Sequence, residues 1–244
     1  MPLVDDVRWF EIGPEFALTV AFVVAGLVGV RTAAASRGVR TPRSAWGRAF
    51  GYFGVCWAAA WATGVTPTVF SDAPVSEDQW SSASWWVWMA GSAAVIVIAY
   101  GLIWPRGTLT HGRPRQAAWS LGFGLAWGLA QGQLYLTFWS IAERIFGAGF
   151  LAGVGVWLAI SAFTGIWQDQ YWDRLVSPEH NIAAWNARKV VLCHVPNLVV
   201  TLTFLGVHQN GLIFVLLQTA ALVLSCWFMR FPGPTSAGAV TGAG

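Results

Sequence analysis

Three polar side chains recur on one face of an otherwise apolar stretch of the chain. His194, Asn197 and Thr201 are spaced i, i+3 and i+7, so a helix over 189–207 would carry them as a single stripe. Pro196 lies between them and would kink that helix. An imidazole at this depth can accept or transfer a proton, so we predict His194 as a catalytic residue and Asn197 as a substrate ligand. The alternative is a structural histidine bonded to a neighbouring helix.

A second group of polar residues follows the apolar run 146–167. Asp169 and Asp173 would lie one turn apart if that helix continues, and two such carboxylates can share a Mg²⁺ ion with phosphate oxygens of a substrate. His180 is a candidate proton carrier, and Arg174 and Lys189 could bind a phosphate. A solvated helix end with ordinary surface ion pairs would explain the same residues without any ligand.

Further candidate ligands are amides and aromatic rings within apolar runs. Gln131 and Tyr135 are four residues apart and share one helix face, where they form either interhelical hydrogen bonds or the polar wall of a pocket. Gln218 is another amide inside an apolar run and a candidate partner of His194. Deep tryptophans would line an apolar pocket and stabilise a cationic intermediate by their ring faces. These tryptophans are Trp57, Trp61, Trp127 and Trp157.

The elements that must position these residues are predicted to be transmembrane helices. The 244 residues are 56% hydrophobic and only 10% charged, whereas soluble domains carry about 25% charged residues. A membrane span needs about 20 apolar residues. Seven runs approach that length, near 13–32, 49–70, 84–104, 117–139, 146–167, 189–207 and 211–230. We therefore predict an all-α, polytopic seven-helix bundle formed by residues 1–231, followed by a disordered cytoplasmic tail over 232–244.

The loops between these runs differ strongly in charge. Eleven of the fourteen lysines and arginines fall in the first, third and fifth loops, and the other loops hold most of the acids. Lysine and arginine accumulate on the cytoplasmic side of membrane proteins, so the pattern predicts an outside N-terminus and an inside C-terminus in the cell membrane. Tryptophans would mark both interfaces. The outer set is Trp80, Trp85, Trp86 and Trp88, and the inner set is Trp46, Trp104, Trp119, Trp167, Trp172 and Trp227.

Small residues at four-residue spacing predict close helix packing. Gly124, Gly128 and Gly132 fall on one face of a predicted helix, and Gly149 and Gly153 fall on one face of the next. Because such faces let two backbones approach closely, we expect 117–139 and 146–167 to form a tight hairpin.

Several classes of function are disfavoured by the sequence. Cys56, Cys193 and Cys226 have no zinc-binding spacing and are predicted to be apolar packing residues. Phosphate-loop, hydrolase and metalloprotease motifs are missing, and no basic stripe suits nucleic acid. Lys189 is the only lysine, so the seventh predicted helix lacks the Schiff-base lysine of a rhodopsin.

The order of parts resembles the small membrane-bound terpene cyclases of meroterpenoid pathways. The similarity lies in length, seven helices, an arginine-rich first inner loop, an aromatic second span (Cys56-Trp57 to Trp61) and a seventh span ending Cys226-Trp227-Phe228-Met229-Arg230-Phe231. Members of that family carry a catalytic glutamate in the second span and an aspartate in the seventh. Here those stretches offer Ala58 to Ala60 and Gln218, so the resemblance does not supply the acid groups.

These features together predict a membrane enzyme that acts on an apolar isoprenoid or lipid by acid–base chemistry, similar to a cyclase or isomerase. The site would lie between the fourth and seventh helices toward the cytoplasmic side, because that half of the chain holds nearly all the costly intramembrane polar groups. Two alternatives remain open: a transporter or channel for a small solute, and an accessory subunit of a membrane complex. A homo-oligomer is compatible with either class.

Overall fold

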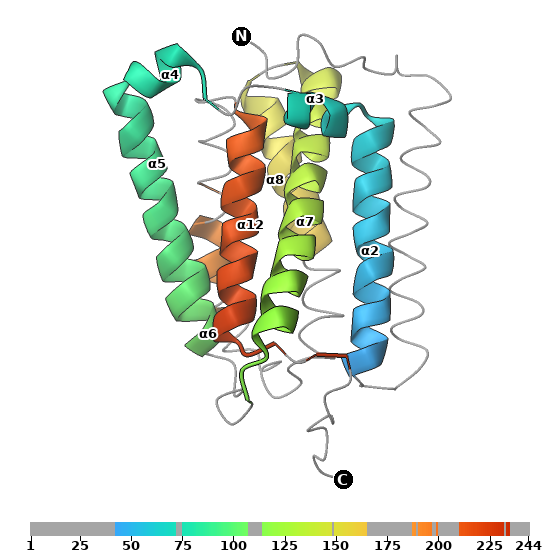
Figure 1. Ribbon diagram of the computed structural model, residues 1–244. Coiled ribbons are helices and arrows are strands. Elements are labelled where there is room, and N and C mark those ends of the chain that lie inside the picture. Colours follow the sequence, from blue (N-terminus) through green and yellow to red (C-terminus); the bar gives the residue numbers. More distant parts are fainter. Residues whose placement is uncertain are drawn as a thin grey trace.

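A computed structural model describes residues 42–71, 75–106, 114–147, 149–164, 187–188, 190–196, 199, 210–231 and 233–234. Every regular element in these residues is a helix, as predicted, and they contain no strand (Figure 1). The elements are α2 (Pro42–Ala62), α3 (Val65–Ser71), α4 (Glu77–Ser81), α5 (Ala83–Ile96), η1 (Val97–Ile103), α6 (Trp104–Arg106), α7 (Ala117–Phe146), α8 (Phe150–Thr164), η4 (Val190–His194) and α12 (Gly211–Phe228). The predicted span 13–32, most of 189–207 and nearly all of the tail 232–244 lie outside the described residues.

The glycine seam of α7 packs against α12, so the predicted partner was wrong. A Cβ added at Gly124 would lie 2.6 Å from the Cα of Val223, and one at Gly132 would lie 3.1 Å from the Cα of Val215. A Cβ at Gly128 would collide with the backbone of Thr219. Only glycine lets the two backbones approach this closely, because every other residue would place an atom inside the neighbouring helix.

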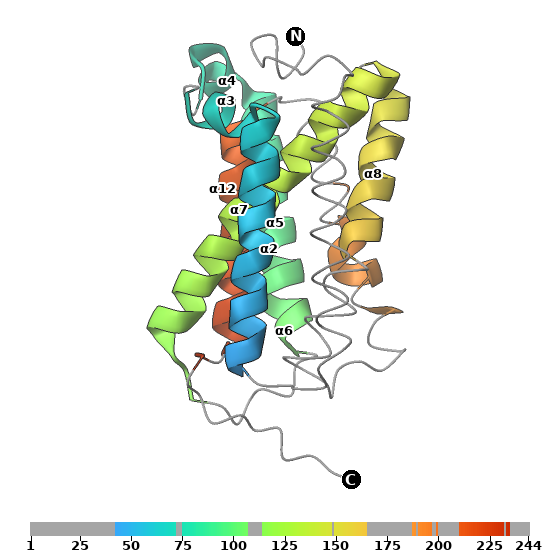
Figure 2. The ribbon, with the colours of Figure 1, turned by 90° about the vertical axis from the view of Figure 1, so that its right-hand side faces the viewer.

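Helix α8 does follow α7 as its neighbour, but through a different residue than expected. Figure 2 shows α8 turning back beside the end of α7. A Cβ at Gly155 would meet the ring of Phe146 at 3.0 Å, whereas one at Gly149 or Gly153 would meet nothing within 4 Å. The contact between α7 and α8 therefore uses one glycine near the turn and not the predicted small-residue face.

The predicted second span is broken. Helix α2 ends at Ala62, Gly64 takes a φ of 76°, and α3 starts at Val65. A positive φ is nearly free for glycine and costly for other residues, so Gly64 allows the chain to turn here. The segments Ala49–Ala62 and Val65–Ser71 meet at an angle of 80°. Residues 49–70 thus form a long helix and a short cross-piece instead of one straight helix.

The third predicted span is one continuous rod from Ala83 to Ile103, preceded by a capped turn. Ser82 accepts a hydrogen bond from the amide of Trp85 at the start of α5. The last seven residues form the π-helix η1, a wide geometry that often marks functional sites. Two side chains donate to its carbonyls: Ser225 Oγ to Tyr100 O at 3.1 Å and Cys193 Sγ to Ala99 O at 3.3 Å.

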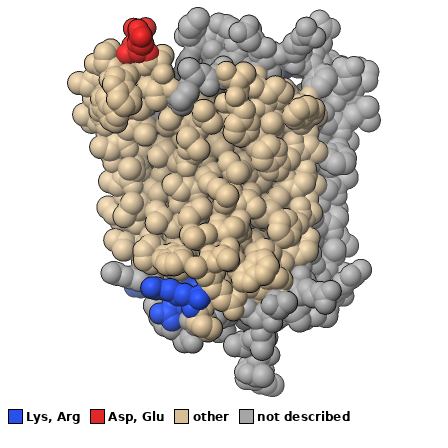
Figure 3. Space-filling view, in the orientation of Figure 1, with Lys and Arg blue, Asp and Glu red and all other residues tan. Residues whose placement is uncertain are grey.

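On the face of the bundle that Figure 3 shows, the described residues carry no charged side chain between the two ends. In Figure 3 acidic atoms lie at the end that carries α4, basic atoms lie at the opposite end, and a broad belt between them has neither. Two helices are long and apolar enough to cross a membrane, Ala83–Ile103 and Gly211–Phe228, and a third if the bent pair at α2 and α3 counts as one span. The described residues therefore contain two or three candidate spans, and the count of seven stays a prediction because 13–32 and most of 189–207 lie outside those residues.

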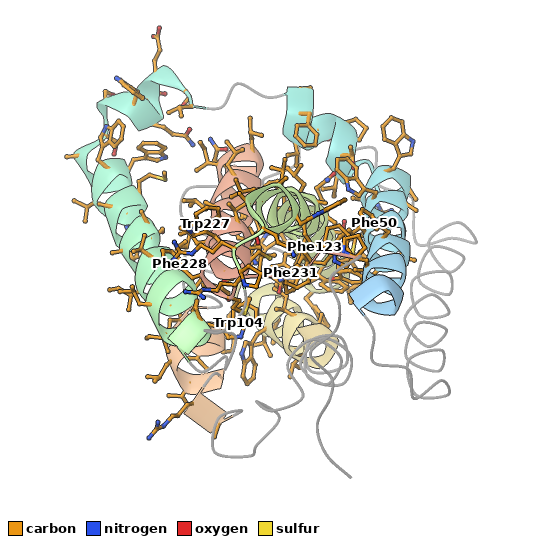
Figure 4. All side chains as sticks on the ribbon, turned by 60° about the horizontal axis from the view of Figure 1, so that its bottom comes forward. Phe50, Trp104, Phe123, Trp227, Phe228 and Phe231 are labelled. Atoms are coloured by element: carbon orange, nitrogen blue, oxygen red, sulfur yellow. The ribbon has the colours of Figure 1, made fainter. Side chains whose placement is uncertain are left out.

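Aromatic side chains form a packed layer at the basic end of the bundle (Figure 4). Phe123 stacks on Phe231 with ring centroids 4.4 Å apart, and Trp46 packs on Phe123 at 4.8 Å. Trp46 and Trp104 were predicted to lie at the membrane interface, but they are only 6% and 1% exposed. Both rings belong to the core, because the layer is made of inward-facing residues from several helices.

Candidate functional site

The register of α7 and α12 places two buried glutamines at the same depth. Gly128 faces Thr219 and Gly132 faces Val215, so the two helices run antiparallel with residue numbers that sum to 347 at equal height. Gln218 therefore lies level with residue 129, two residues from Gln131. At a rise of about 1.5 Å per residue, the two side chains differ in height by roughly 3 Å.

The two glutamines differ in how they are satisfied. Gln131 Nε2 donates a 2.6 Å hydrogen bond to the hydroxyl of Tyr135, one turn later on α7. This pairing agrees with the shared helix face predicted from the sequence. Gln218 is 2% exposed, and its Nε2 has no hydrogen-bond partner among the described residues. Leaving a buried amide without a partner costs about 1–3 kcal/mol.

The face of α12 that carries Gln218 points toward η1. Ser225 is seven residues, or two turns, after Gln218 and so lies on the same face, and its hydroxyl donates to the carbonyl of Tyr100 in η1. The phenol of Tyr135 lies within electrostatic range of the phenol of Tyr100. Residues of α7, α12 and η1 therefore converge on one interior region.

A third tyrosine completes this region, and the sequence did not reveal it. Tyr52 of α2 is fully buried, and its phenol interacts with that of Tyr135 and with the thiol of Cys56 one turn away. We name the set Tyr52, Tyr100, Gln131, Tyr135 and Gln218 the buried polar centre. Three of its members, Tyr52, Tyr100 and Gln218, stand alone on separate helices, so no spacing pattern links them. The only available signal was that three of the four tyrosines fall inside apolar runs.

Two reduced cysteines border the buried polar centre. Cys56 lies beside Tyr52, and Cys193 interacts with Tyr100 while its thiol donates to the carbonyl of Ala99. Both thiols are buried, as is Cys226. The packing role predicted for the cysteines is thus joined, at Cys193, by a hydrogen bond into the π-helix.

The buried polar centre is electrically neutral and has aromatic neighbours. All buried polar side chains of the described residues are uncharged amides or hydroxyls. Trp127 is 1% exposed and packs edge-on against Trp104 at 6.2 Å. No group of three or more metal-ligating side chains occurs in the part of the chain that the structure describes. Phenols and amides of this kind can hydrogen-bond a neutral oxygen and move a proton.

The structure brings together only some of the predicted site residues. Gln131, Tyr135, Trp127 and Gln218 all lie in or beside the buried polar centre. Trp157 is 46% exposed on α8, which separates it from that interior. The described part of the site is also halfway along α7, since Gln131 is the fifteenth of its 30 residues, and not near the basic end.

The remaining predicted residues fall where the structure gives no side chain. His194 is the last residue of η4, and η4 packs against η1, which borders the buried polar centre. The others lie outside the described residues: Asp169, Asp173, Arg174, His180, Lys189 and Asn197.

Trp57 and Trp61 correct another expectation. They were predicted to line an interior pocket, but they are 36% and 67% exposed on the outer face of α2. The ring of Trp57 instead stacks on Phe70 of α3, with centroids 6.3 Å apart and planes 5° from parallel. The direction in which the two rings point was therefore predicted wrongly.

Comparison with known proteins does not assign this arrangement. No family model matches the chain, and neither the curated proteins nor the solved structures give a significant match.

Proposed function

We propose that this chain is a multi-pass protein of the cell membrane, with seven spans, an outside N-terminus and a cytoplasmic C-terminus. The seven apolar runs and the uneven distribution of arginine support this topology. The uncharged belt of Figure 3 supports it as well, with Glu77 and Asp78 of α4 at one end. At the other end Arg115 lies over the ring of Trp227, 5.7 Å from its centroid, as expected for a basic and aromatic interface.

On this proposal the protein is an enzyme that converts an apolar isoprenoid or lipid by acid–base chemistry. The observation that carries it is the convergence of three phenols and two amides on one interior region at mid-depth. Intramembrane polar groups are expensive to bury and are usually retained for function. Tyr135 would exchange or share a proton with the substrate, Gln131 would hold the phenol in place, and Trp127 would cover an apolar or cationic part of the substrate.

The predicted residues outside this region complete the proposal. His194 and Asn197 would approach the substrate from the predicted helix 189–207, in which η4 lies. Asp169, Asp173 and His180 would supply a stronger acid or hold a head group with Arg174 and Lys189, and Mg²⁺ is the ion that such carboxylates suit. The similarity to meroterpenoid cyclases gives the same reaction class, but without that family's carboxylates.

A transporter for a small polar solute is the second candidate, and one observation favours it. Hydrogen-bonded polar pairs occur at two depths of the bundle: Asn210 with Gln79 near the acidic end, and Thr66 with Gln133 and Gln131 with Tyr135 near the middle of α7. A chain of polar groups that spans the bilayer is what a solute path needs. The pairs satisfy one another, however, which favours a structural use for most of them.

Lipid extraction and mass spectrometry of cells with and without the protein test the enzymatic proposal. We expect one or more isoprenoids or lipids to change in abundance, and Tyr135→Phe to abolish the change. Thr137→Val is the matched control, because its hydroxyl donates only to the backbone carbonyl of Gln133 on its own helix. Unchanged lipids with altered solute uptake would favour transport, and no change in either would favour an accessory subunit.

A further inference from the structure

The unpartnered amide of Gln218 is the feature of the buried polar centre that its internal contacts do not explain. Gln218 is one of twelve buried polar residues in the part of the chain that the structure describes, and most of the others donate or accept a hydrogen bond within the protein. Its neighbour Thr219 bonds the carbonyl of Val215 at 2.7 Å, and Ser225 bonds that of Tyr100. Buried donors that are left open in a native protein require a reason, and a bound ligand is one.

The surroundings of Gln218 restrict what that ligand can be. Its amide N–H is a donor, so the ligand group must be an acceptor. The buried side chains of the described residues provide no positive charge, and a phosphate or carboxylate buried among neutral amides and phenols would be strongly destabilised. The ligand atom must therefore be a neutral oxygen. The adjoining core is aromatic and aliphatic, so the remainder of the ligand must be apolar.

We infer that Gln218 binds the uncharged carbonyl-type oxygen of an apolar ligand at the level of Gln131. This inference rests on the proposed function and deepens it, because it assigns a neutral oxygenated substrate to the mid-depth site and places any anionic head group elsewhere. Gln131 and Tyr135 lie within one helical turn in height and supply the second polar contact. The wide η1 helix lies on the same side of α12 and borders the site.

Binding of matched probes to purified protein in lipid nanodiscs tests this inference. The probes are 2-nonanone, 2-undecanone and 2-tridecanone, each compared with the alkane of the same length and with undecanoate, and intrinsic tryptophan fluorescence reports binding. We expect at least one ketone to bind the wild type roughly tenfold more tightly than its alkane, as one hydrogen bond of ordinary strength provides. Undecanoate should not bind at this site.

Gln218→Leu is the decisive variant, because it replaces the amide with a branched apolar side chain and so removes the donor. We expect it to reduce the ketone-to-alkane ratio to about one, and the comparison between the two proteins cancels differences in partition into the lipid. Without ligand, the variant should melt at the same temperature as the wild type or roughly 2–4 °C higher, since an orphaned amide is removed. A control variant, Thr137→Val, should keep the wild-type ratio.

Two results would overturn the inference. One is a lower melting temperature of ligand-free Gln218→Leu, which would give the amide a structural role or a bound water. The other is an equal ketone-to-alkane ratio in the wild type and in Gln218→Leu for every chain length. Failure of this inference can be told apart from failure of the proposed enzymatic function. If the inference alone fails, cells that carry Gln218→Leu keep the wild-type lipid profile, while Tyr135→Phe still abolishes the lipid change. If Tyr135→Phe leaves the lipid profile unchanged, the enzymatic function fails.

Discussion

The hydroxyl of Thr66 donates a 2.6 Å hydrogen bond to Oε1 of Gln133, 67 residues later in the chain. Thr66 is the second residue of α3, directly after the turn at Gly64, and Gln133 lies on the long helix α7. Gln133 Nε2 in turn donates to the carbonyl of Leu129 at 3.1 Å. This hydrogen bond ties the short helix α3 to the centre of the bundle. Both partners are buried, so solvent does not substitute for either of them.

Replacing Thr66 with valine should destabilise the protein by about 1–3 kcal/mol, because the shape is kept while a buried acceptor on Gln133 loses its donor. Unfolding of the purified protein in detergent, followed by tryptophan fluorescence, measures the loss. The double variant Thr66→Val with Gln133→Leu should recover part of it, since neither polar group then remains. If the two single losses simply add, the bond does not couple the two helices.

Gly128→Ala should be strongly destabilising, while Gly122→Ala on the same helix should not be. The added methyl group at residue 128 would enter the backbone of Thr219, but at residue 122 it meets nothing within 4 Å. Overpacking of a tight contact costs about 1–3 kcal/mol, and alanine otherwise favours a helix over glycine. Thermal unfolding of the two variants gives the comparison. Equal stability of both would mean that α7 and α12 are not in contact along this seam.

The close packing of α7 could be predicted from its glycines, but its partner could not. Spacing identifies a face of one helix, and any other helix with a compatible surface can cover it. The partner turned out to be α12, whose Thr219 and Val215 lie more than eighty residues farther along the chain. Only the three-dimensional arrangement decides between α8 and α12, so local pattern was insufficient.

The boundaries of two helices were predictable, whereas the directions of side chains were not. Runs of apolar residues gave 84–104 and 211–230, close to the observed Ala83–Ile103 and Gly211–Phe228. Helices that are apolar all round carry little information about which face is inside. For this reason Trp61 was expected inside but is exposed, and Tyr52 and Tyr100 of the buried polar centre were missed. Gln131 and Tyr135 were found because both lie on one helix.

Ionisation of the Glu143 carboxyl should lower the stability of the folded protein as pH rises. Partial burial raises the pKa of this carboxyl above its ordinary value of 4.5, and the nearby indole of Trp139 opposes the shift. The residue lies beyond the predicted span 117–139, in the last turns of α7. A raised folded pKa means that the folded protein binds more protons than the unfolded chain between the two pKa values, so stability falls as pH increases across that window.

The melting temperature of the wild type and of Glu143→Gln, measured from pH 4 to pH 8, tests this sign. The wild type should lose stability relative to the variant as pH rises above 4.5 and should level off above the raised pKa. Glu77→Gln, at an exposed carboxylate on α4, is the control and should follow the wild type. A wild type that gains stability relative to Glu143→Gln over this range would contradict the assignment.

The native cysteines should not react with thiol reagents in the folded protein, because Cys56, Cys193 and Cys226 are at most 1% exposed. Mass spectrometry after treatment with N-ethylmaleimide should find no labelled cysteine in mild detergent and three after denaturation in SDS. Labelling of any native cysteine in the folded state would show that its helix opens to solvent.

Because the native cysteines are unreactive, membrane orientation can be tested directly with two single cysteine substitutions at exposed positions. Asp78→Cys lies on α4 at the acidic end, and Pro114→Cys lies just before α7 at the basic end. Because arginine-rich loops are retained in the cytoplasm, a membrane-impermeant maleimide applied to intact cells should label residue 78 and not residue 114. Permeabilised cells should label both. Labelling of both positions in intact cells would place the two ends of the helix Ala83–Ile103 in one compartment, and that helix could then not cross the bilayer, whatever its length and apolar character.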